Sequence, residues 1–180
     1  MRKLALSDEI LLSVDKAARY IGGEVNSVMK DKNKVDIRFA MCFPDVYEIG
    51  MSNLGMMILY NMFNEREDVW AERVFSPWLD LDKIMREKEI PLFALESQEP
   101  VKNFNFLGIT LGYEMCYTNV LQVLDLSHVS LLAKDREEDD PIVIGGGACA
   151  YNPEPIAEFF DMFYIGEGET VYDALFDAYK

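Results

Sequence analysis

Three cysteines have the side-chain chemistry best suited to hold a metal ion or an iron–sulfur cluster. Cys42, Cys116 and Cys149 each lie near the carboxyl end of a predicted strand, so they could approach one another. Thiolate sulfur binds zinc and iron–sulfur clusters. Unpaired cysteine is also common in protein cores as a small apolar residue. Because no Cys-x-x-x-Cys-x-x-Cys triplet occurs, we favour the core interpretation and predict no metal site.

Carboxylates and one histidine are the candidates for acid–base chemistry. Glu167 and Glu169 stand in the segment Gly-Glu-Gly-Glu, and Glu169 is predicted to open a C-terminal helix. Carboxylates there complement the helix dipole and cap free N–H groups, a role favoured over general acid–base catalysis. His128 follows a predicted helix at 118–126 and is expected at the sheet edge opposite the binding loops. We therefore do not expect this chain to catalyse a reaction alone.

The elements that position these residues follow from hydrophobic periodicity. Strand character is found at 35–43, 69–75 (more weakly), 91–95, 104–113, 142–147 and 160–166. Helix character is found at 53–63, 81–89, 118–126 and 169–179. Such alternation implies right-handed crossovers. We predict an α/β fold of the flavodoxin-like, doubly wound type, with a five-stranded parallel sheet.

The first 34 residues are predicted to be an N-terminal helical extension, and residues 35–180 the α/β domain. Ser7 or Asp8 can cap a helix whose apolar positions are Ile10, Leu11, Val14 and Ala18. Two glycines at 22–23 end that helix.

Composition limits the class of protein. Half of the residues are hydrophobic, as in a globular chain, and the formal net charge is −15. This charge disfavours direct binding to nucleic acids or to anionic membranes. No apolar run approaches the roughly 18 residues needed to span a bilayer. The poor signal peptide and the odd number of cysteines favour a cytoplasmic location.

Four loops are expected at the carboxyl ends of the strands, where open parallel sheets bind ligands. They span residues 44–52, 113–118, 145–152 and 166–169. Glycine is dense in three of them, which lets the backbone approach a ligand closely.

The first of these loops resembles a known signature. Asp45-Val46-Tyr47-Glu48-Ile49-Gly50 is similar to the cobalamin-binding pattern Asp-x-His-x-x-Gly, with tyrosine in place of histidine. The resemblance continues in the helix that follows, in the run IVIGGG and in the run FYIGEGE. These segments stand in the same order as in cobalamin-binding domains fused to radical-SAM barrels. Residues 20–180 as a whole resemble the N-terminal, cobalamin-binding-like domain of an uncharacterised branch of the radical-SAM proteins.

The resemblance implies a way of binding cobalamin. In histidine-bearing members, imidazole lies beneath cobalt and the aspartate holds it. Tyr47 is a poor substitute, because a phenol with a pKa near about 10 is neutral at pH 7. Some similar enzymes bind cobalamin without a protein histidine, with the nucleotide tail in a cleft between sheet and helices. Thr110 and Gly112 are suitably small for such a cleft, whereas Tyr113 and Met115 could fill it instead. The implied cofactor-binding residues are Asp45, Tyr47, Gly50, Thr110, Gly112, Tyr113, Gly145, Gly146, Gly147, Gly166, Glu167 and Gly168.

The implied function is that of an accessory domain that presents cobalamin, or a substrate, to a radical-SAM barrel of the same polypeptide. That barrel, expected beyond Lys180, would carry a [4Fe–4S] cluster and S-adenosylmethionine. Two alternatives remain open. One is a degenerate domain that acts as an interaction scaffold without a cofactor. The other is a flavin- or nucleotide-binding domain, favoured only if residues 145–147 cradle a phosphate.

Overall fold

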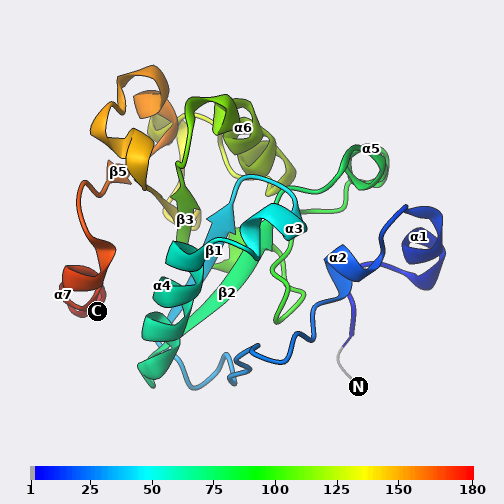
Figure 1. Ribbon diagram of the computed structural model, residues 1–180, viewed down its shortest axis with the longest axis horizontal. Coiled ribbons are helices and arrows are strands. Elements are labelled where there is room, and N and C mark those ends of the chain that lie inside the picture. The colour runs from blue at the N-terminus through cyan, green and yellow to red at the C-terminus, as the bar shows by residue number, and fades with distance from the viewer. Residues whose placement is uncertain (1–2) are drawn as a thin grey trace.

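A computed structural model describes residues 3–180 and contains one five-stranded parallel sheet (Figure 1). Its strands are β1 (Ile37–Phe43), β2 (Val69–Phe75), β3 (Phe106–Thr110), β4 (Ile142–Gly146) and β5 (Met162–Phe163). The strand order is β2-β1-β3-β4-β5, and every pairing is parallel. This is the flavodoxin-like order, in which the direction of winding switches between β1 and β3. The predicted fold class is confirmed.

Helices cover both faces of the sheet. The α-helices are α1 (Asp8–Ser13), α2 (Ala18–Ile21), α3 (Tyr47–Gly50), α4 (Leu54–Glu65), α5 (Leu79–Lys88), α6 (Tyr117–Leu126) and α7 (Tyr172–Tyr179). Short 3-10 turns are η1 (Val101–Asn103), η2 (Glu114–Cys116), η3 (Ala133–Asp135), η4 (Ala148–Tyr151), η5 (Glu154–Phe159) and η6 (Gly168–Thr170). No helix within residues 3–180 is both long and apolar enough to cross a membrane.

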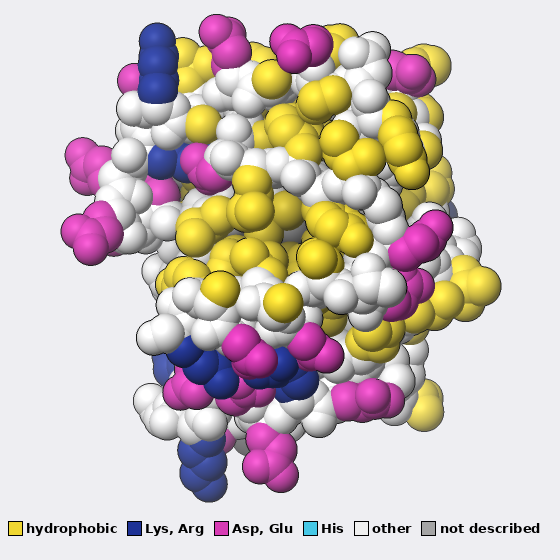
Figure 2. All heavy atoms as spheres, turned by 90° about the vertical axis from the view of Figure 1, so that its left-hand side faces the viewer, with side chains coloured by type: hydrophobic (Ala, Val, Ile, Leu, Met, Phe, Trp, Pro, Cys, Tyr) yellow, Lys and Arg dark blue, Asp and Glu magenta, His cyan; other side chains and the backbone are white. Residues whose placement is uncertain are grey.

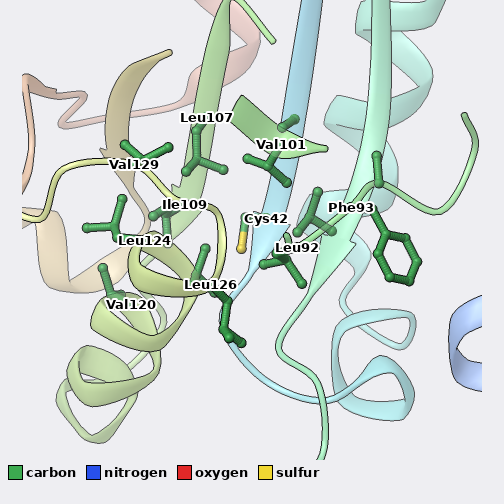
Figure 3. Packing of buried hydrophobic residues seen from close by; sticks show 14 of the residues in the cluster. Cys42, Leu92, Phe93, Val101, Leu107, Ile109, Val120, Leu124, Leu126 and Val129 are labelled. Carbon is green, nitrogen blue, oxygen red and sulfur yellow. The ribbon is translucent and has the colours of Figure 1, made fainter. Parts of the chain in front are cut away.

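Alternation along β1 divides the core into two layers. Phe39 and Met41 face α4 and α7, in one apolar cluster that also contains Phe63 and Phe176. Ala40 and Cys42 face the opposite layer, which α1, α5 and α6 supply. Figure 3 shows this second layer, with Cys42 among aliphatic side chains from β3, α6 and the segment around residue 92.

The segment 91–95 is not a strand of the sheet, contrary to prediction. Phe93 instead forms an antiparallel bridge with Pro100, which makes 91–101 a tight excursion beside β2. The Leu95 N–H donates to the Arg73 carbonyl at 2.8 Å, and the Val101 N–H donates to the Leu92 carbonyl at 2.9 Å. The segment is apolar because its side chains are buried against the core, and burial alone does not distinguish such a loop from a strand.

Two helix boundaries also differ from prediction. The N-terminal helix breaks into α1 and α2, where the Asp15 N–H donates to the Asp80 carboxylate at 2.8 Å instead of continuing the helix. At the C-terminus, Glu169 lies in η6, and α7 begins only at Tyr172. The Glu167 side chain makes no capping hydrogen bond. Its carbonyl accepts the hydroxyl of Tyr164 at 2.7 Å, and this contact shapes the turn.

Candidate functional site

A cleft of about 240 Å³ lies between one face of the sheet and the helix α4. Strands β1, β3 and β4 form its back wall, α4 forms one side, and the segment from Tyr164 to Tyr172 forms the other. Figure 2 looks onto this side of the molecule and shows hydrophobic side chains gathered around a hollow. The position agrees with the expectation that a ligand binds near the carboxyl ends of β1 and β3.

Aromatic rings close the floor of the cleft. The Phe39 ring lies against Gly108, where a Cβ atom would come within 2.5 Å of it. Phe63 meets Phe39 edge-on at 5.0 Å between ring centroids, and it meets Tyr172 at 4.6 Å. Such pairs fix one another through their preferred geometry, so the depth of the cleft is set by packed rings.

Small residues keep the upper part of the cleft open. A Cβ atom added at Gly146 would point into empty space, with no atom within 4 Å. At Gly147, φ is +99° and a Cβ atom would lie 2.9 Å from the Leu111 carbonyl oxygen, so only glycine fits there without strain. Gly145 has a different role, because its missing side chain makes room for the rings of Phe160 and Phe163.

The predicted ligand-contacting residues fall into two groups. Six of them line the cleft: Thr110, Gly146, Gly147, Gly166, Glu167 and Gly168. The other six do not line it: Asp45, Tyr47, Gly50, Gly112, Tyr113 and Gly145. The sequence interpretation overlooked the α4 wall, formed by Asn53, Met56, Leu59 and Phe63. These four residues are spaced three or four positions apart, which places them on one face of a helix. That spacing could have identified this face of α4 as a wall of the site.

Tyr47 points away from the cleft. Its ring meets Phe75 edge-on at 5.6 Å between centroids. Burial and the nearby Glu24 carboxylate raise the pKa of Tyr47 above the usual value for a phenol. Gly50 serves packing, because a Cβ atom there would collide with the Phe75 ring. Neither residue therefore offers a donor atom to a ligand in the cleft.

Asp45 instead binds the next loop of the sheet. The Tyr113 hydroxyl donates to Asp45 Oδ2 at 2.6 Å. Asp45 Oδ1 accepts the Val46 N–H at 2.7 Å. The hydrogen bond to Asp45 raises the pKa of Tyr113 to about 12, so the phenol stays protonated at neutral pH. A second link, from the Asn119 side chain to the Pro44 carbonyl at 2.9 Å, joins the same two loops.

Charge in the cleft is acidic. Glu167 and Glu169 are the only charged side chains among the described residues that line it. Phosphate-binding sites normally supply backbone N–H groups at a helix N-terminus, or basic side chains. Here the glycine run 145–147 ends in the short turn η4 rather than in an α-helix.

The cysteines and the histidine lie outside the cleft. Cys42 and Cys116 are buried and Cys149 is half-buried, and burial raises the pKa of the Cys42 and Cys116 thiols. Among residues 3–180, no group of three His, Cys, Asp or Glu side chains is arranged to hold a metal ion. His128 follows the C-terminal end of α6, close to Arg86 and Asp125.

Exposed apolar side chains surround the carboxyl edge of the sheet. Met115 is 85% exposed, Tyr151 is 73% exposed and Leu54 is 72% exposed. We call the following set the edge rim: Ile49, Leu54, Tyr113, Met115, Tyr151 and Ile165. They come from the loops, turns and helix starts that follow four different strands, β1, β3, β4 and β5. Exposed apolar residues gathered in this way mark surfaces that bind a ligand or another protein surface.

Comparison with known proteins gives three findings. A family model described as "Radical SAM proteins, N-terminal" matches residues 55–180. An uncharacterised protein of Methanocaldococcus jannaschii is 29% identical over 133 residues, which cover 72% of this chain and 24% of that protein. The chain thus spans about a quarter of this curated relative. A crystal structure of a cobalamin-binding protein from Desulfitobacterium hafniense is similar over 79% of this chain and 58% of that chain, with a TM-score of 0.41 and 16% identity.

Proposed function

Because the chain belongs to the family of radical SAM proteins, N-terminal, we propose that it is an accessory domain that holds a corrinoid such as cobalamin. The corrin ring lies over the carboxyl edge, and the nucleotide tail enters the cleft beside α4. The bound group supplies cobalt chemistry to a radical-SAM barrel of the same polypeptide, which carries a [4Fe–4S] cluster and S-adenosylmethionine. Residues 1–34 serve as an extension to the binding domain 35–180.

The space beside Gly146 is the observation that carries this proposal. It leaves a slot beside β4 where a side chain would otherwise lie. The cleft that contains this slot is also lined by Met41, Met56 and Tyr172, which suit a flat, mostly apolar group such as the base of the tail. Methionine adapts its shape to such groups. The lining offers no basic residue among residues 3–180, so we place the anionic phosphodiester of the tail at the open end of the cleft, away from Glu167 and Glu169.

The edge rim supports the proposal that a radical-SAM barrel docks on this domain. The relative from M. jannaschii is about four times as long as the part that this chain matches, so a large further segment is available to cover the rim. A radical-SAM barrel seated there would enclose the corrin between two apolar surfaces. Excluding water in this way protects reactive intermediates from side reactions.

The flavin or nucleotide alternative finds less support. Gly145 makes room for packed rings, whereas Gly146 and Gly147 line the cleft, so the three glycines do not form one phosphate cradle. The charged side chains that line the cleft are also negative. A flavin or nucleotide phosphate cradled by residues 145–147 would lie inside the cleft with Glu167 and Glu169 and without a compensating cation in the described lining, whereas the corrinoid tail can leave its phosphodiester at the open end. The scaffold alternative differs from our proposal in one measurable property, which is uptake of a corrinoid.

Isothermal titration with hydroxocobalamin tests the proposal. Wild-type protein should bind with a dissociation constant below the hundred-micromolar range, or about −5 to −6 kcal/mol or tighter. Gly146→Val should weaken binding at least roughly tenfold, which corresponds to about 1.4 kcal/mol, because its methyl groups fill the slot. Asn61→Val is the control, since Asn61 lies on the exposed face of α4 and outside the cleft.

The outcomes separate the alternatives clearly. No saturable heat from the folded wild type, here and in the longer polypeptide, would reject corrinoid binding and favour the scaffold. Equal losses in Gly146→Val and Asn61→Val would show that the cleft does not hold the tail.

A further inference from the structure

The hydrogen bond between Tyr113 and Asp45 spans the centre of the carboxyl edge. Asp45 follows β1 and Tyr113 follows β3, and these strands are neighbours at the switch point of the sheet. Ligands of open α/β sheets bind at this crevice. The bond is short, at 2.6 Å, and its acceptor is a carboxylate, which makes it stronger than a bond between neutral groups.

The hydrogen bond to Asp45 fixes the direction of the partly exposed Tyr113 side chain. The residue is 40% exposed, so its hydroxyl could point into water. It points instead across the crevice to Asp45. The side of the ring and the neighbouring Met115, which is 85% exposed, therefore present apolar surface at the carboxyl edge of the sheet, outside the lining of the cleft.

Both carboxylate oxygens of Asp45 accept a hydrogen bond. One accepts the Tyr113 hydroxyl and the other accepts the Val46 N–H. Asp45 therefore has no oxygen committed to Tyr47, whose ring lies against Phe75 instead. Asp45 therefore binds Tyr113, which follows β3, and does not bind Tyr47, which lies two residues after it in the same loop.

We infer that Tyr113, held by Asp45, is the residue that faces the lower side of the bound corrin and excludes water from cobalt there. This inference rests on the proposed function. A phenol whose proton is donated to a carboxylate is a poor metal ligand, because it must lose that proton to bind strongly. Tyr113 is thus a positioning residue that covers the metal without ligating it.

Electron paramagnetic resonance of bound cob(II)alamin tests this role. The longer polypeptide, whose barrel would cover the upper side of the corrin, is loaded with cob(II)alamin in water enriched in the magnetic isotope of oxygen, which broadens the cobalt signal only where water reaches the metal. Wild-type protein should show neither this broadening nor splitting from a nitrogen ligand. Tyr113→Ala should show the broadening, because removing the ring opens the lower side. Tyr47→Ala is the matched control and should match the wild type.

Three results would count against the inference or its premise, and they are distinct. Absence of protein-bound cob(II)alamin in the wild type would contradict the proposed function itself. Broadening in the wild type, or in Tyr47→Ala but not in Tyr113→Ala, would overturn only the role of Tyr113. Circular dichroism melts check folding, and removal of a surface ring should leave the folded state intact. Should Tyr113→Ala fail to fold, Tyr113→Ser replaces it in the same measurement with the same expected broadening.

Discussion

At the scale of single residues, the molecule contains a buried ion pair that must be kept intact for stability. Arg73 and Glu96 are both fully enclosed and meet at 2.7 Å between Nε and Oε1. Arg73 also pairs with Glu24 at 3.3 Å and lies over the ring of Tyr60. This network ties residues 24–27 and the excursion after residue 91 to the edge strand β2.

Breaking this buried pair should be costly. Glu96→Ala leaves the buried Arg73 without its closest carboxylate, with Glu24 at 3.3 Å as the other ion-pair partner, and such losses destabilise proteins by about 3–5 kcal/mol. Urea unfolding followed by circular dichroism measures the change. Glu67→Ala, at an exposed site, is the control and should change stability by less than about 0.5 kcal/mol. A similar small effect at Glu96 would show that the pair contributes little.

The Tyr113–Asp45 bond should be visible in a pH titration. The carboxylate raises the pKa of Tyr113 to about 12, whereas an unfolded tyrosine titrates near about 10. The stabilisation from this bond is therefore complete below about pH 10 and is lost as pH rises through the folded value. Asp45→Asn should lower the pKa of Tyr113, as followed by tyrosinate absorbance. The shift should vanish when Asp45→Asn is combined with Tyr113→Phe, and a shift that persists there would assign it to another tyrosine.

At the scale of elements, α4 is the helix that builds the cleft. The Asn53 side chain accepts the Met56 N–H at 2.9 Å and so begins the helix. Asn53→Ala should cost about 1 kcal/mol of stability, measured by urea unfolding. Asn61→Ala, on the exposed face of the same helix, should cost clearly less. Equal costs would mean that the cap does not stabilise α4.

The same helix shows what the sequence could and could not predict. The cap at Asn53 and the apolar spacing after it are local signals, so the position of α4 was predictable. The segment 91–95 has equally local signals, yet its conformation depends on a contact with Pro100 and on burial beside β2. The start of α7 depends likewise on Tyr164, which binds the Glu167 carbonyl.

In the candidate site too, some features follow from local sequence and others depend on packing. Glycines at strand ends mark possible close approaches, so Gly146 and Gly147 were predictable from position alone. Tyr47 was expected near the ligand because it stands where a histidine stands in the signature. Which way a side chain turns depends on its packing partners, here Phe75 and Glu24, and these cannot be read from the loop itself.

At the scale of the whole molecule, we expect the edge rim to contact the proposed radical-SAM barrel. Met115 lies in the rim, whereas Met29 is also exposed but lies in the N-terminal segment. Oxidation by dilute hydrogen peroxide converts exposed methionine to sulfoxide. In the longer polypeptide, Met115 oxidation, followed by mass spectrometry, should slow at least several-fold relative to this chain, while Met29 should change little. Equal rates at Met115 in both proteins would contradict docking at the rim.

The central claim is that the cleft beside α4 holds the tail of a corrinoid. A crystal structure of the chain grown with saturating hydroxocobalamin tests it most directly. We expect density for the tail between Gly146 and the Met56 side of α4, with the corrin over the carboxyl edge and Tyr113 beneath it. Density for the cofactor elsewhere on the molecule, or a cleft still empty at saturation in both this chain and the longer polypeptide, would contradict corrinoid binding in the cleft.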